Sequence, residues 1–301
     1  MATPKRSGLD WSKLSSLKLR ARFVAEGYYA GAHRSRRRGS GVEFGGHRQY
    51  TRGDDLRWLD RHSLMRHGKL LIREFETDTE QALWLVLDAS RSMAFRGNAE
   101  VPTKFDYGSV VAAALARVAV ASGDLVALSW LGERAQGLPP GGGTESFDRI
   151  VTALESARPT ADLCEDPANV ARALGLVARR ARRGSVIVVL SDLLDLPSET
   201  LDLVLSLTAG QRTLTVVRVL DPAEVHFPYT GALELVASEG DLRLETDASA
   251  SRAGYLDELA RSGRSWRHAL VSRGAGYVET STAHDPAELV RTILNAGEGA
   301  A

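Results

Sequence analysis

Between Ala82 and the C-terminus, apolar strand-like runs alternate with amphipathic helical segments, and this alternation leaves few folds open. The run Leu83–Leu87 is continuously apolar, and Ser185–Leu190 is apolar after its first residue, which is typical of strands buried on both faces of a sheet. Strands that alternate with helices form a mostly parallel sheet with helices on both faces. We therefore expect a doubly wound α/β fold. The expected strands are Leu83–Leu87, Leu125–Trp130 with a short return strand after it, Ser185–Leu190, Thr213–Val219 and Gly276–Glu279; the expected helices are about Lys104–Ala121, Ser146–Ala157, Pro167–Arg180, Pro197–Leu207, Ala253–Arg273 and Pro286–Leu294.

The first 80 residues have a different, basic character. They contain a possible helix at Ser12–Glu26, the basic tract Arg34–Gly41 and a strand at Lys69–Phe75. We expect residues 1–80 to form a basic, β-containing N-terminal segment, and residues 81–301 to form the α/β domain. Within that domain a small hairpin excursion is expected at about 221–250, from the runs Leu233–Val236 and Leu242–Glu245.

Composition places the chain among ordinary globular proteins, with 44% hydrophobic and 25% charged residues. No stretch reaches the roughly 18 uninterrupted apolar residues of a membrane span, and the N-terminus lacks the apolar core of a secretory signal. The lone cysteine, Cys164, cannot form an internal disulfide, which fits a reducing compartment. We therefore expect a cytoplasmic protein without a membrane span.

Charge is balanced over the whole chain but not along it. Met1–Phe75 holds 17 Lys and Arg against 7 Asp and Glu, and the remainder is acidic by the same margin of ten. One interpretation is a footprint for nucleic acid. We favour the other, in which the basic end meets an acidic protein surface, because no recognisable nucleic-acid module accompanies it.

A carboxylate and two hydroxyls follow the first strand of the α/β region. Asp88, Ser90 and Ser92 are spaced at i, i+2 and i+4, so one turn can direct all three oxygens to one point. Oxygen ligands of this kind suit a hard cation such as Mg²⁺. The alternative is an ordinary turn in which Asp and Ser bond to nearby backbone.

Two more oxygen sources are expected at the same edge of the sheet. Thr144 lies in the glycine-rich loop Pro139–Thr144, and Asp192 follows the buried strand Ser185–Leu190. Ligands of open α/β sheets bind outside the carboxyl ends of the strands. We therefore expect Asp88, Ser90, Ser92, Thr144 and Asp192 to form one metal site.

This pattern resembles the metal-ion-dependent adhesion site of von Willebrand factor A domains. Asp88, Ser90 and Ser92 match that family's first motif, Thr144 its threonine and Asp192 its aspartate. The resemblance implies Mg²⁺ as the ion, with Mn²⁺ or Ca²⁺ as alternatives. It also implies a partner protein whose Asp or Glu completes the ion's ligands.

The upstream segment resembles the bacterial family called domain of unknown function 58, which joins such a signature to a von Willebrand factor A-like domain. One departure is Arg61, where the family typically has Trp. The matching residues are Glu26-Gly27, His33–Ser35, Gly39–Phe44 and Arg48–Asp60.

The family resemblance implies a non-enzymatic adaptor that works with a MoxR-type AAA+ ATPase in chaperone-like assembly. An alternative is a Mg²⁺-dependent phosphohydrolase of the haloacid-dehalogenase type. Such an enzyme needs a second Asp where this chain has Ser90, and a lysine on the phosphate, yet no lysine follows Lys104. Neither a Gly-x-Ser-x-Gly nucleophile nor a His-Glu-x-x-His zinc motif is present. We therefore expect no enzymatic activity, with nucleic-acid binding as the third hypothesis.

Overall fold

The computed structural model describes residues 16–31, 43–49, 71–76, 82–132, 137–163, 166, 168–194, 196–240 and 242–298. The chain divides into two compact units, which are described separately. The larger unit comprises Met1–His33 together with Ala82–Ala301, and the smaller comprises Arg34–Gln81. The basic tract Arg34–Arg38 and Cys164 lie outside the described residues.

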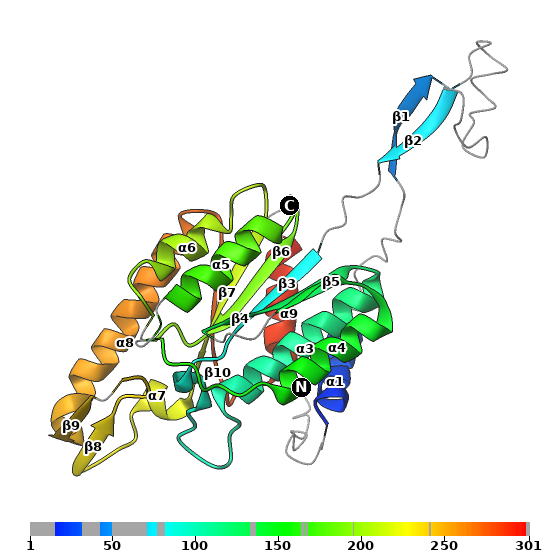
Figure 1. Cartoon of the computed structure of the whole chain (residues 1–301). Helices are drawn as coiled ribbons and strands as arrows, with labels where there is room; N and C mark the ends of the chain where they lie inside the picture. Colours follow the sequence, from blue (N-terminus) through cyan, green and yellow to red (C-terminus); the bar gives the residue numbers. More distant parts are fainter. Residues whose placement is uncertain are drawn as a thin grey trace, which may run out of the picture. The chain divides into compact units, whose positions relative to one another are not determined.

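A six-stranded sheet forms the centre of the larger unit (Figure 1). Its strand order is β10-β7-β6-β3-β4-β5, and every neighbouring pair is parallel except β4 and β5. The predicted doubly wound, mostly parallel α/β fold is confirmed. The strands are β3 (Ala82–Asp88), β4 (Leu125–Leu131), β5 (Leu138–Gly141), β6 (Val186–Ser191), β7 (Thr213–Leu220) and β10 (Gly276–Ser281).

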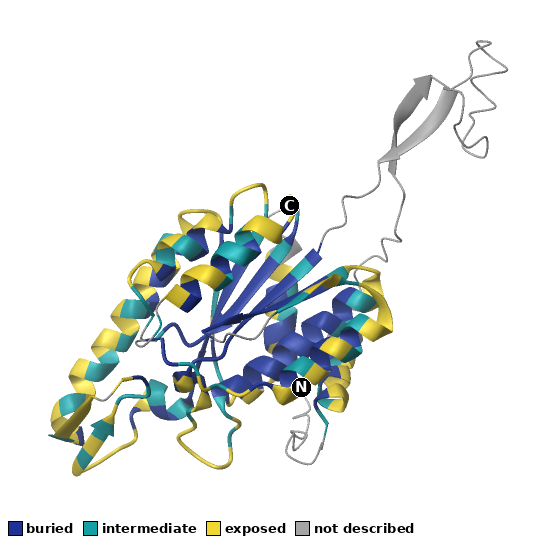
Figure 2. Cartoon of the chain, in the orientation of Figure 1, coloured by how far each residue is buried: buried dark blue, intermediate teal, exposed yellow. Residues whose placement is uncertain are grey.

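Two helical layers cover the sheet, and each has its own apolar core. On β3, Leu85 and Leu87 pack into one core while Trp84 and Val86 pack into the other. This double burial explains why the strand sequences are continuously apolar (Figure 2). The first layer holds α1 (Leu17–Gly31), α3 (Lys104–Ser122), α4 (Gly143–Ser156) and α9 (Pro286–Glu298); the second holds α5 (Ala168–Arg180), α6 (Thr200–Ser206) and α8 (Ala248–Val271).

Helix α3 is the central helix of the first layer. Its N-cap Thr103 accepts a hydrogen bond from the Asp106 backbone, and Gly123 ends it in the left-handed conformation with φ of 92°. Among the described residues, α3 alone has the length and apolar composition of a membrane span. Most of it is buried inside the protein, and core helices also meet that criterion. The expected cytoplasmic location stays a prediction.

Helix α1 corrects the expected domain boundary at residue 80. Its side chains Leu17, Ala21 and Val24 are buried in the core shared with α3, α4 and α9. The Lys18 ammonium also lies 2.5 Å from the Asp148 carboxylate on α4. The N-terminal helix is therefore part of the α/β unit, and the chain between 34 and 81 forms the second unit.

Two hairpins complete the described structure. In the smaller unit, β1 (Glu43–Gln49) pairs antiparallel with β2 (Leu71–Glu76). In the larger unit, β8 (Ala232–Val236) pairs with β9 (Arg243–Asp247), which confirms the expected hairpin excursion. The short helix α7 (Pro222–His226) follows β7 and precedes this hairpin.

Candidate metal centre

Asp88 ends strand β3 and is fully buried. Its Oδ1 accepts a hydrogen bond from the Ser90 backbone N–H at 2.9 Å, and its Oδ2 accepts one from the Ser191 hydroxyl at 2.6 Å. The backbone bond is the turn that Asp commonly forms at the end of a strand. It directs the carboxylate towards the carboxyl edge of the sheet.

The two serines of the motif come together beside Asp88. Ser90 and Ser92 are both buried, and their hydroxyl oxygens lie 3.0 Å apart. A short 3₁₀ helix, η3 (Arg91–Ala94), produces this spacing by turning the chain back immediately after β3. The i, i+2, i+4 pattern therefore gathers its oxygens as predicted.

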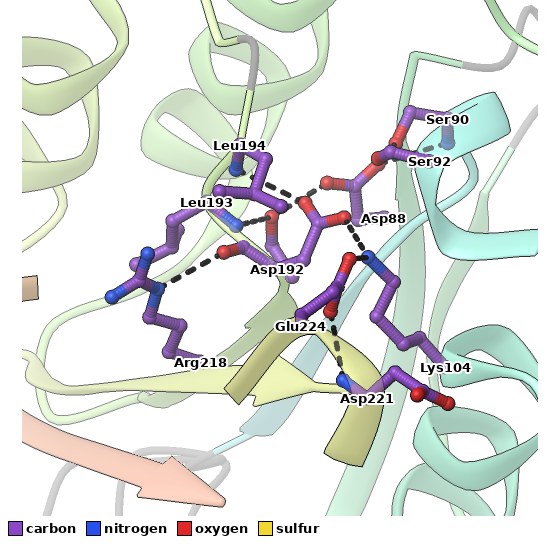
Figure 3. Close-up of polar contacts among 11 residues, drawn as sticks. Asp88, Ser90, Ser92, Lys104, Asp192, Leu193, Leu194, Arg218, Asp221 and Glu224 are labelled. Atoms are coloured by element: carbon purple, nitrogen blue, oxygen red, sulfur yellow. Dashed lines mark hydrogen bonds and ion pairs between the residues drawn. The ribbon is translucent and has the colours of Figure 1, made fainter. Parts of the chain in front are cut away.

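Asp192 reaches the same place from the neighbouring strand. Strand β6 pairs directly with β3, with Leu190 opposite Leu87, so the residues that follow both strands meet at one edge (Figure 3). Asp192 is fully buried; its Oδ1 accepts from the Leu194 N–H at 3.1 Å, and its Oδ2 from the Lys104 ammonium at 2.7 Å. Four of the five predicted ligands therefore gather at one point.

Thr144 does not join them, and that part of the predicted site is wrong. The return strand β5 runs antiparallel to β4 and ends at Gly141, opposite Val126. Asp88 instead lies opposite Leu131, five residues further along β4, which is about 16 Å at 3.3 Å per residue. Thr144, exposed in the first turn of α4, therefore lies near the amino edge of the sheet.

A different segment borders the candidate centre. Ala161 forms a parallel bridge to Ser90: its N–H donates to the Ala89 carbonyl at 3.1 Å, and its carbonyl accepts from the Arg91 N–H at 2.8 Å. Thr160 immediately precedes it, in the connection between α4 and α5. This threonine was not among the predicted ligands, although it also lies between the return strand and the strand that precedes Asp192.

Lys104 and Glu224 are the other residues that the sequence analysis missed. Lys104 is the first residue of α3, is fully buried, and its ammonium lies 2.7 Å from Asp192 Oδ2 and 2.5 Å from Glu224 Oε1. Glu224 belongs to the capping box of α7, in which its Oε2 accepts from the Asp221 N–H at 2.7 Å. A lysine that opens an otherwise apolar helix was the available signal.

The electrostatics of the centre follow from burial. Burial is the main cause that raises the pKa of Asp88 from 3.8 to about 6, and the neighbouring Asp192 carboxylate adds to it. The hydrogen bonds from Ser191 and Ser90 act in the opposite direction but do not cancel the increase. Burial alone would lower the pKa of Lys104, but the charges of Asp192 and Glu224 raise it above its ordinary value, so Lys104 is a cation. Burial also raises the pKa of Glu224.

The donor set fits a hard divalent cation. Asp88, Asp192, Ser90 and Ser92 offer only oxygen atoms, as Mg²⁺ prefers. No Lys, Arg or His among the described residues forms an ion pair with the buried Asp88 carboxylate. The described part of the chain holds no cluster of three or more His, Cys, Asp or Glu side chains arranged around one ion. Any ion here would depend on the serine hydroxyls and on ligands from outside.

A family model described as "Protein of unknown function DUF58" matches residues 46–265, more than two thirds of the chain. The chain belongs to this family. The DUF58 match covers most of the smaller unit's hairpin, the candidate centre and most of α8. It thus confirms the family resemblance noted in the sequence.

Relatives of similar length occur in mycobacteria. Uncharacterized proteins of Mycobacterium bovis and Mycobacterium tuberculosis are each 28% identical over 313 residues, covering 98% of this chain and 93% of the relative.

Solved structures similar to this DUF58 chain have lower identities. An aerotolerance-related membrane protein from Bacteroides fragilis has a TM-score of 0.46 at 16% identity, and the conserved hypothetical protein BatB from Bacteroides thetaiotaomicron has 0.43 at 14%. In both cases 73% of this chain and 99% of the other are covered. The VWA domain of SpRpn10 has a TM-score of 0.38 at 14% identity, with 71% and 94% covered.

Proposed function

We propose that this DUF58 protein is a non-enzymatic interaction module that binds an acidic residue of a partner protein through Mg²⁺. Asp88, Ser90, Ser92 and Asp192 would hold the ion, with Mn²⁺ or Ca²⁺ as substitutes. The bound ion would supply an open position for a carboxylate oxygen. The proposed partner is a MoxR-type AAA+ ATPase, as the family resemblance implies.

One observation carries the metal assignment, namely the carboxylate of Asp88. It is fully buried, has no cationic side chain paired with it among the described residues, and lies beside two buried hydroxyls. Buried carboxylates are normally paired with a cation or bound to a metal. A cation bound at this point would remove the repulsion between Asp88 and Asp192 that raises the pKa of Asp88.

The experiment that tests the function measures partner binding with and without the ion. The MoxR-type ATPase from the same source is immobilised, and the affinity of wild type and Asp88→Ala is measured in Mg²⁺ and in EDTA. We expect binding in Mg²⁺ to fall by a hundredfold or more in EDTA or in the variant. Equal affinity in all four conditions would contradict the proposal.

Thr160 provides a more local prediction. Because its neighbour Ala161 bonds to the backbone on both sides of Ser90, we expect the Thr160 hydroxyl to contribute to the ion's surroundings. Thr160→Val should weaken Mg²⁺ affinity, measured by calorimetry, by about tenfold or more. Thr144→Val is the matched control and should leave the affinity unchanged. Loss of Mg²⁺ affinity in the Thr144 variant alone would mean that Thr144, and not Thr160, lies beside the ion.

The phosphohydrolase alternative gains one group from the structure but still lacks another. Lys104 supplies a lysine beside Asp192, yet its ammonium is held by two carboxylates and is fully buried. Such an enzyme needs an aspartate as general acid two residues after its nucleophile, and this chain has Ser90 at that position. We therefore propose that the chain lacks this activity, and hydrolysis of p-nitrophenyl phosphate in Mg²⁺ would show otherwise.

A further inference from the structure

Lys104 is a cation fixed inside the candidate centre. Its ammonium contacts Asp192 and Glu224, and it lies over the Phe95 ring, 5.6 Å from the ring centroid. Cations are disfavoured at the N-terminus of a helix, where the helix dipole is positive. Lys104 nevertheless occupies the first position of α3, so the two carboxylates and not the helix hold it there.

Glu224 is equally fixed. One of its oxygens accepts from the Asp221 N–H within the α7 capping box, and the other contacts Lys104. This pair links the first residue of α3 to α7, and Lys104 also contacts Asp192 in the loop after β6, as Figure 3 shows. Without Lys104, Glu224 would be a buried carboxylate with no cationic partner in the described ion pairs, whereas Lys104 without Glu224 would keep its pair with Asp192.

The charges around the centre can be counted. When all are ionised, Asp88, Asp192 and Glu224 contribute three negative charges, and Lys104 contributes one positive charge. The Arg218 guanidinium pairs with Glu279, and the Asp221 carboxylate caps α7, so the count covers only the four side chains that meet at the centre. The centre therefore carries a net charge of two negative, which one divalent cation neutralises.

We propose that Lys104 and Glu224 set the charge of the metal centre, so that it selects a divalent over a trivalent cation. This inference rests on the proposed function, since it concerns the same centre. Lys104 and Glu224 are positioning residues here: they determine the field at the ion without being its ligands. Removing Lys104 leaves a charge of three negative, and removing Glu224 leaves one.

The test is a double-mutant cycle on ion preference. Calorimetric Kd values for Mg²⁺ and La³⁺ are measured at pH 7 for wild type, Lys104→Gln, Glu224→Gln and the double variant. Lys104→Gln should shift the ratio of the two affinities towards La³⁺ on the order of tenfold to a hundredfold. Glu224→Gln should shift the ratio in the opposite direction, and the double variant should return it to the wild-type value. Lys18→Gln, which breaks only the exposed pair with Asp148, is the control and should not change it.

Each result is decisive. Equal ratios in all variants, or a double variant that behaves like Lys104→Gln, would overturn the charge assignment while leaving the metal site in place. If Lys104→Gln does not fold, the opposite shift in Glu224→Gln and its return in the double variant still support the assignment, and their absence overturns it. A wild type that binds neither ion would overturn the proposed function itself, and the charge assignment with it.

Discussion

Asp88→Asn should make the metal-free protein more stable at neutral pH while removing its response to Mg²⁺. The folded-state pKa of Asp88 is about 6, above its ordinary value of 3.8, so the folded protein disfavours the charged form. At pH 7.5 this costs the wild type up to about 3 kcal/mol, since each pKa unit corresponds to about 1.4 kcal/mol. Asparagine removes the charge and can still accept the Ser90 bond.

Because the pKa of Asp88 is raised on folding, the stability difference between the two proteins depends on pH. Below pH 4 Asp88 is protonated in both the folded and unfolded states, so the variant has no advantage. As the pH rises from about 4 to 6 the wild type loses stability relative to the variant, and above pH 6 the difference is constant. Mg²⁺ should then restore stability to the wild type alone.

Thermal unfolding of both proteins at pH 4 and pH 7.5, in EDTA and in Mg²⁺, measures the stability difference between them and its dependence on the ion. We expect the variant to melt roughly 5 to 10 °C higher than the metal-free wild type at pH 7.5. Asp106→Asn changes a carboxyl in the exposed part of the first turn of α3 and should give no such gain. A less stable Asp88→Asn protein at pH 7.5 would mean that the carboxylate already has a compensating partner.

Ala21→Asp should destabilise the α/β unit by about 3–5 kcal/mol, the usual cost of an unpaired buried charge. Ala21 lies on α1 and is fully buried in the core that α1 shares with the other helices, and Val24 on the same helix is also fully buried. The expected result is a large fall in the melting temperature of the whole α/β unit, measured by calorimetry as one transition. It follows from placing α1 in that unit.

Phe23→Asp is the matched control on the same helix. Phe23 is 42% exposed, so an aspartate there keeps contact with water. We expect a loss of less than about 1 kcal/mol, as for most surface substitutions. If both variants unfolded at the same temperature as the wild type, α1 would not contribute to the core.

The α/β layers could be predicted from sequence because each strand and helix carries its own signal. The run Val186–Leu190 is apolar at every position, which is typical of a strand covered on both faces of a sheet. The N-terminal boundary could not be predicted in this way. Ala21 and Val24 lie in a short helix with many basic residues, and only the tertiary contact with α3 shows that it belongs to the core.

The candidate site shows the same limit. Asp88, Ser90 and Ser92 are local in sequence, and Asp192 follows the strand next to β3, so their meeting follows from the fold. Thr144 was misplaced because a return strand carries the chain back to the amino edge, and a short strand rich in Pro and Gly gives a weak signal of direction.

Lys104 and Glu224 come from elements whose mutual approach depends on how the loops after β3, β6 and β7 pack. One close contact there is visible at Gly97, where an added Cβ would lie 2.2 Å from that of Ala223. No pattern of spacing in the sequence encodes that approach. The pairing of Lys104 with Glu224 could therefore not be predicted from the sequence, although the lysine that opens α3 was a local signal.

The α/β unit is built from two separate stretches of the chain, because residues 34–81 between them form the other unit. Helix α1 is held by apolar packing and by the Lys18–Asp148 pair, and the polypeptide between it and β3 runs through the other unit. We therefore expect the α/β unit to assemble from two separate polypeptides. A synthetic peptide of residues 1–33 should reassociate with residues 82–301 as a split protein, with the smaller unit removed altogether.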